Sequence, residues 1–185
     1  QSMKTRTFNI ALCGIIASLS VVIMLSTALI PVATYAAPAL AGIILAVPVI
    51  EINKKWALAS YAAAAAVSAI IVPDKEAVAF FVLFFGYYPI LKQAVEAHIK
   101  NKWLQLLIKT LCFSAAVATY FIAIYLLGIS SEEFTIFGIN LPIIFLLAGI
   151  VVFIIFDNAL SGVIATYVNR LRQKIFGSIK SNTKL

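Results

Sequence analysis

The sequence predicts an all-α integral membrane protein, a bundle of six transmembrane helices with both the N- and the C-terminus in the cytoplasm. Hydrophobic residues make up 63% of the 185 residues and charged residues only 11%, whereas a soluble domain usually carries about a quarter charged residues. The apolar residues form continuous runs of helical length rather than the short alternating strands of a membrane β-barrel. If the predicted spans cross the membrane in alternating directions, the basic residues are concentrated on one side of the membrane.

Six apolar runs follow one another along the chain, each close to the length of about 20 residues that crosses a bilayer. They cover residues 7–30, 32–50, 56–72, 77–95, 103–127 and 141–171. The second run carries Pro38 and Pro48 and begins almost where the first ends, so a re-entrant segment that leaves five spans is the alternative. In the six-span organisation, residues 4–172 form a single transmembrane domain. Residues 1–3 are interpreted as a tag remnant and residues 173–185 as a basic cytoplasmic tail.

Lysine and arginine decide between the two topologies. With six spans and the N-terminus inside, thirteen of the fourteen basic residues lie on the cytoplasmic side, in the inner segments or the inner ends of the spans, and only Lys75 lies outside. Cytoplasmic loops carry an excess of Lys and Arg, so six spans are predicted for a multi-pass protein of the cell membrane, in contact with lipid. Trp56 and Trp103 then both lie at the inner boundary, where indole rings are favoured. The net charge of +7 is therefore a topology signal, and no nucleic-acid partner is predicted.

The sequence lacks the patterns of the common enzyme and metal sites. His98 is the only histidine, which excludes the spacing of a zinc protease. There is no Gly-Lys-Ser/Thr of a Walker A loop and no Gly-x-Ser-x-Gly elbow. Cys13 and Cys112 lie inside apolar runs, away from any metal-ligand pattern. We therefore predict no enzyme activity, no metal and no cofactor.

Small residues line one face of the first predicted helix, where Ala11 accompanies the pair Gly14 and Ser18 at a spacing of four. In lipid, small residues allow helix backbones to approach closely, and van der Waals contact then drives association. This face is a candidate for docking another membrane subunit. The alternative is packing within the same chain.

Charges inside the apolar runs form a second candidate feature. Lys92 and Asp157 each lie about 16 residues from the predicted outer end of their helix, which is about 24 Å at 1.5 Å per residue. Glu51 ends the second run near the same depth. Because a charge in hydrocarbon costs at least about 2.5 kcal/mol, we predict a polar cluster of Glu51, Lys92 and Asp157. It is either a structural ion pair or part of gating or coupling.

Tyrosines and outer-loop charges are the candidate ligand-binding groups. Tyr87 and Tyr88 precede Pro89, which should kink the fourth helix; two phenols there suit a lined pocket or a packed kink. The first outer loop contains Tyr35 among helix-breaking and small residues. Such a loop can fold over a binding site as a lid. The outer loops also carry the charged residues Asp74, Lys75, Glu76, Glu132 and Glu133, which either clamp a zwitterionic or anionic ligand or are solvated turn residues.

Three segments carry a resemblance to a known family: residues 10–17, residues 72–76 and the stretch 84–89 that ends in Gly-Tyr-Tyr-Pro. With the chain length and predicted topology, they resemble the substrate-binding S component of energy-coupling factor transporters, or uncharacterised membrane proteins with that fold. The family often shows Ala-x-x-x-Ala in its first helix, where this sequence has Gly14-x-x-x-Ser18.

The resemblance implies that this subunit captures a vitamin or other micronutrient from the extracellular side. A separate membrane coupling subunit and cytoplasmic ATPases would supply the energy. The ligand site implied by position consists of Tyr35, Asp74, Lys75, Glu76, Tyr87, Tyr88 and Glu132. Two alternatives remain, a non-transporting membrane scaffold or assembly subunit and a stand-alone proton-coupled carrier that uses Asp157.

Overall fold

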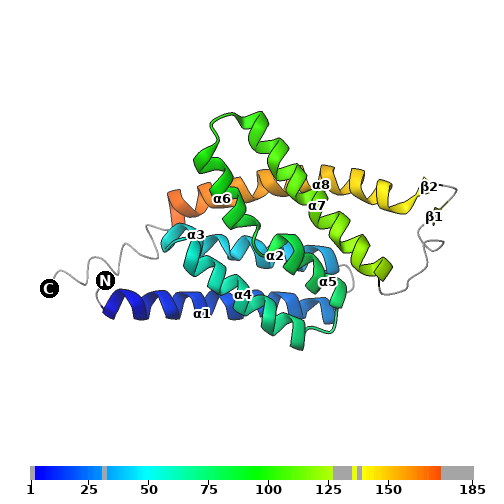
Figure 1. Cartoon of the computed structure of the whole chain (residues 1–185). Coiled ribbons are helices and arrows are strands. Elements are labelled where there is room, and N and C mark those ends of the chain that lie inside the picture. The colour runs from blue at the N-terminus through cyan, green and yellow to red at the C-terminus, as the bar shows by residue number, and fades with distance from the viewer. Residues whose placement is uncertain (1–2, 31–32, 127–134, 137–138, 172–185) are drawn as a thin grey trace. The chain divides into compact units, whose positions relative to one another are not determined.

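The chain is helical nearly throughout, apart from one short β pairing. The structure is a computed structural model that describes residues 3–30, 33–126, 135–136 and 139–171. The chain forms two compact units, Gln1–Ile150 and Val151–Leu185, which are described separately. For the described residues the predicted all-α fold is confirmed (Figure 1).

Each predicted apolar run is helical over most of its described residues, and two runs are divided by a turn. The helices in chain order are α1 (Met3–Leu25) with the 3₁₀ turn η1 (Ser26–Ala28), α2 (Ala33–Ile44), α3 (Ala46–Glu51), α4 (Lys54–Ile71), α5 (Lys75–Phe80), the π-helix η2 (Phe81–Phe85), α6 (Tyr88–His98), α7 (Lys102–Leu126), α8 (Leu141–Thr166) and the π-helical turn η4 (Tyr167–Leu171). Within the predicted connection before α8, β1 (Thr135–Ile136) pairs antiparallel with β2 (Ile139–Asn140).

Five helical segments are long and apolar enough to cross a membrane. They are Arg6–Ala28, Ala33–Glu51, Lys75–His98, Lys102–Ala123 and Leu146–Arg170. Helix α4 has 18 residues but begins with two lysines, which lower its mean hydropathy, and it is not one of the five. The described residues thus fit a multi-pass membrane protein, while the sixth span and the side of the termini stay predictions.

Prolines and polar caps set several of these helix ends. Pro48 has no N–H to donate to the carbonyl of Ile44. The second run is therefore interrupted at Leu45, which separates α2 from α3. Helix α4 begins after Asn53, whose Oδ1 accepts from the Trp56 N–H at 3.1 Å. It ends before Val72, which is extended because Pro73 follows.

The core of the first unit lies where α1 packs against α2 and α4. Small side chains such as Ala17, Ala41 and Ala64 are buried there beside larger ones that include Met24 and Phe81. Serine hydroxyls add hydrogen bonds between the helices: Ser20 Oγ donates to Ala41 O at 3.3 Å, and Ser60 Oγ donates to Cys13 O at 3.4 Å. In lipid such close contacts stabilise helix pairs.

Gly42 lies at a close approach between α2 and the fourth apolar run. A Cβ placed at Gly42 would lie 2.3 Å from the carbonyl oxygen of Phe85. That carbonyl receives no hydrogen bond from position 89, because Pro89 has no N–H. The absence of a side chain at Gly42 lets the α2 backbone pack directly against this peptide.

Replacing Gly42 with alanine should therefore destabilise the protein although alanine is the better helix former. We expect Gly42→Ala to lower the free energy of unfolding by about 1–3 kcal/mol, as overpacking does, measured by thermal unfolding in detergent. Gly14→Ala is the matched control, since a Cβ there meets nothing within 4 Å, and it should leave stability equal or slightly higher. Equal melting temperatures for the two variants would contradict the close approach.

Candidate functional site

Polar side chains from α2, α5 and α7 meet beside the first turn of α5. Thr34 Oγ1 donates to Asp74 Oδ2 at 2.6 Å, and the Tyr35 hydroxyl donates to Glu76 Oε1 at 3.2 Å. The Tyr120 phenol, from α7, is also hydrogen-bonded to Glu76. We call Thr34, Tyr35, Asp74, Glu76 and Tyr120 the α5 cluster. It contains two carboxylates and three hydroxyl groups.

Aromatic rings form one side of the α5 cluster. The ring of Phe80 lies with its centroid 5.0 Å from that of Tyr120, stacked, and 5.5 Å from that of Tyr35. Such ring pairs are favourable beyond the area they bury. Tyr35, Asp74 and Glu76 were predicted from the sequence, whereas Thr34, Phe80 and Tyr120 were missed. Tyr120 lies in the middle of a long apolar run, and no local pattern points to it.

Asp74 and Lys75 also cap helices. Asp74 Oδ1 accepts from the Ala77 N–H at 3.0 Å, as the N-cap of α5. Lys75 Nζ donates to Ala69 O at 2.8 Å and to Val72 O at 3.0 Å, where α4 ends and its last carbonyls lack helical donors. The Lys75 ammonium thus bonds to the end of α4, and the groups of the α5 cluster are acidic, hydroxylic and aromatic.

The other predicted ligand-binding residues do not belong to the α5 cluster. Tyr88 is fully buried, with its ring 4.8 Å from that of Phe84. Tyr87 is half-buried, with its ring 6.1 Å from that of Tyr61. Both lie at the break between η2 and α6, about three helical turns along the chain from Glu76. Glu132 lies outside the described residues.

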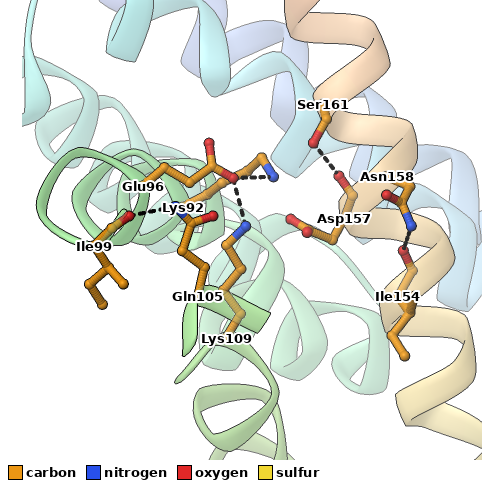
Figure 2. A network of polar contacts seen from close by, with 9 residues as sticks. All are labelled: Lys92, Glu96, Ile99, Gln105, Lys109, Ile154, Asp157, Asn158 and Ser161. Carbon is orange, nitrogen blue, oxygen red and sulfur yellow. Dashed lines mark hydrogen bonds and ion pairs between the residues drawn. The ribbon is translucent and has the colours of Figure 1, made fainter. Parts of the chain in front are cut away.

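A second charged group joins α6 to α7. Lys92 Nζ lies 2.7 Å from Glu96 Oε1, and Lys109 Nζ donates to the same oxygen at 2.6 Å (Figure 2). Both lysines are 3% exposed, whereas the Glu96 side chain is 40% exposed. We call these three residues the Lys–Glu–Lys cluster. Glu96 was missed as a partner, although its spacing of four from Lys92 is a helical ion-pair signal.

The predicted cluster of Glu51, Lys92 and Asp157 is divided between the two units. Glu51 ends α3 and lies with Lys92 in the first unit, whereas Asp157 lies in the second. In α8 the Ser161 hydroxyl donates to the Asp157 carbonyl at 2.9 Å, and Asn158 Nδ2 donates to Ile154 O at 2.9 Å (Figure 2). A pairing of Lys92 with Asp157 stays a prediction.

The predicted docking face on α1 is exposed. Ala11, Gly14 and Ser18 all have exposed positions, and Ser18 Oγ donates to Gly14 O at 2.8 Å within the same helix. Cys13 and Ala17, on the adjoining face of α1, are buried in the first unit. The small-residue face is therefore turned away from the packing of α1 against α2 and α4.

Metal chemistry finds no support in the described ranges, where no group of three His, Cys, Asp or Glu side chains is placed to hold an ion. Comparison with known proteins gives no identity: no family model, no curated protein and no solved structure matches this chain. The α5 cluster and the Lys–Glu–Lys cluster are the two groups of interacting polar side chains described above.

Removing the shared carboxylate should destabilise the Lys–Glu–Lys cluster. We expect Glu96→Gln to lower the free energy of unfolding by about 1–3 kcal/mol, less than the 3–5 kcal/mol for a fully buried pair because Glu96 is partly solvated.

Chemical or thermal unfolding in detergent measures this difference. Glu76→Gln serves as the matched control, because the described contacts of Glu76 are with phenols. If Glu96→Gln costs no more than Glu76→Gln, the Lys–Glu–Lys cluster does not stabilise the contact between α6 and α7.

Proposed function

We propose that this chain is a membrane-embedded substrate-capture subunit that binds a small polar micronutrient at the α5 cluster. The observation that carries the proposal is the convergence of Tyr35, Asp74 and Glu76 with Tyr120, from three separate helices. Carboxylates, hydroxyls and aromatic rings together offer both hydrogen bonds and an apolar surface, as small-molecule sites usually do.

A six-span topology with both termini in the cytoplasm is part of this proposal, with α4 as the sixth span. Helix α4 begins with Lys54 and Lys55, whose long side chains can reach the interface while the rest of the helix lies in lipid. The thirteen-to-one division of basic residues supports the same orientation. On this topology the α5 cluster lies at the outer end of the first unit and the Lys–Glu–Lys cluster near the cytoplasm.

We further propose that energy and release come from other subunits. The sequence has no Walker A loop, so a capture subunit of this kind would need partner ATPases and a membrane coupling protein. The exposed face of Ala11, Gly14 and Ser18 on α1 is the proposed docking surface for that coupling protein. This division of labour is the one that the resemblance to S components implies.

The topology is tested by labelling single cysteines in intact cells with a membrane-impermeant maleimide. In a Cys13→Ala and Cys112→Ala background, Pro73→Cys should react from outside, because it lies in the exposed connection before α5. Lys100→Cys, in the exposed connection between α6 and α7, should react only after the membrane is permeabilised. Labelling of Lys100→Cys in intact cells would contradict the proposed orientation.

The capture function is tested by native mass spectrometry of the purified chain, together with thermal shifts from a panel of vitamins and small polar metabolites. We expect a bound small molecule in the wild type and about tenfold weaker binding in Tyr120→Phe, which loses one phenol contact to the cluster.

Thr119→Val is the matched control for Tyr120→Phe. Thr119 is the adjacent residue, is exposed and donates to Ala115 O within α7, so its replacement should leave binding unchanged. A chain that carries no small molecule in several preparations and is stabilised by none of the panel would contradict the capture function and favour a scaffold.

A further inference from the structure

The fourth apolar run contains a wide turn at η2. Gly86 N–H donates to Phe81 O at 2.8 Å, five residues back, instead of to Val82 O as in an α-helix. Such π-helical turns are rare and occur frequently at functional sites. Figure 1 shows the run as two helices, α5 and α6, with an interruption between them. The extra residue in the turn changes the hydrogen-bond pattern of this segment.

Tyr61 of α4 supplies a hydrogen bond to the Val82 carbonyl. Its hydroxyl donates to Val82 O at 2.8 Å, from 21 residues earlier in the chain. A carbonyl inside an apolar bundle needs a donor from the protein, because lipid offers none. The Tyr61 phenol therefore satisfies an acceptor that the wide turn creates.

The ring of Tyr61 also lies directly against Gly86. A Cβ at Gly86 would lie 2.6 Å from Tyr61 Cδ2 and Cε2, closer than carbon atoms can approach. The ring centroid lies 6.0 Å from that of Phe81 and 6.1 Å from that of Tyr87. Tyr61 thus contacts the residues at both ends of the wide turn and also donates a hydrogen bond to the Val82 carbonyl within it.

We propose that Tyr61 is a latch that holds the wide turn at Phe81–Phe85 and that its release lets the turn move along the helix. When such a turn passes a residue, that residue advances by one helical position, about 100° of rotation and 1.5 Å of rise. Movement toward α5 therefore rotates residues near Phe80 relative to α6. This rotation changes the packing of Phe80 against Tyr35 and Tyr120.

The latch gives the two halves of the fourth run different roles. Helix α5 carries Asp74 at its N-cap and Glu76 in its first turn, while α6 carries Lys92 and Glu96. A shift of the wide turn is thus a conformational device that links the α5 cluster to the Lys–Glu–Lys cluster through one helix. The inference concerns the protein without ligand and does not depend on the proposed function.

The test uses the full chain in lipid nanodiscs, labelled with ¹⁵N-glycine and followed by NMR. The sequence has eight glycines, and two of them, Gly42 and Gly86, contact Phe85 and Tyr61. We expect Tyr61→Phe to speed amide hydrogen exchange of Gly86 about fivefold, the effect of one neutral hydrogen bond. The signals of Gly14 and Gly162 should not change.

Thr119→Val is the matched control, since Thr119 is exposed and its hydroxyl donates to Ala115 O within α7, and it should leave the Gly86 exchange rate unchanged. Gly86→Ala is the second variant: its Cβ would lie 2.6 Å from the Tyr61 ring and 2.9 Å from Phe81 O, so it disturbs the ring contact and the wide turn while the Tyr61 hydroxyl is still present. It should shift the Gly42 signal in the same direction as Tyr61→Phe does.

Two results would overturn the latch. One is that Tyr61→Phe leaves both the amide exchange rate of Gly86 and the Gly42 signal as they are in the wild type. The other is acceleration at all observed glycines to the same extent, which would show a general loss of stability. Faster exchange confined to Gly86, with a common Gly42 shift in both variants, supports the latch.

Discussion

A helix interrupted inside an apolar bundle has to bond its displaced backbone groups within the protein, and much of the first unit is arranged around this constraint. The fourth apolar run departs from α-helical bonding at η2 and again at Pro89. Tyr61 from α4 donates to Val82, and the backbone of α2 at Gly42 lies against Phe85. The neighbouring helices are therefore held at positions that the interruption determines.

The same interruption separates two polar regions of different charge. On the α5 side, carboxylates are bonded by hydroxyl groups, with Lys75 bonded to the end of α4. On the α6 side, one carboxylate is shared by two buried lysines. Charges in hydrocarbon are costly unless they are paired. The paired charges in both regions therefore specify which helices contact each other more strictly than apolar packing alone would. Large apolar side chains such as those of Ile70 and Leu111 are largely exposed, as expected for the described part of a membrane protein.

Local sequence features were sufficient to predict the helices and several of their ends. The predicted runs 56–72 and 103–127 agree within one or two residues with α4 (Lys54–Ile71) and with the start of α7 at Lys102. The break beside Pro89 was also predicted, because proline removes a backbone donor whatever its surroundings. The π-helical turn before it was not, since nothing in the sequence Phe-Val-Leu-Phe-Phe distinguishes it from an α-helix. Its acceptor is satisfied by Tyr61, which lies in another helix.

The sequence by itself determined the helical class, the apolar runs and candidate polar positions such as Tyr35, Asp74 and Glu76, because hydropathy, proline and capping act over a few residues. Tertiary structure decided which of these meet. It brought Tyr120 to Glu76, bonded Lys75 to the end of α4 and gave Lys92 the partner Glu96 together with Lys109. The contacts of Lys92 with Glu96 and of Lys75 with Val72 span only four and three residues, whereas those of Tyr120 with Glu76 and of Lys109 with Glu96 join different helices. Such partners depend on the rotation and depth of each helix, which neighbouring residues do not encode.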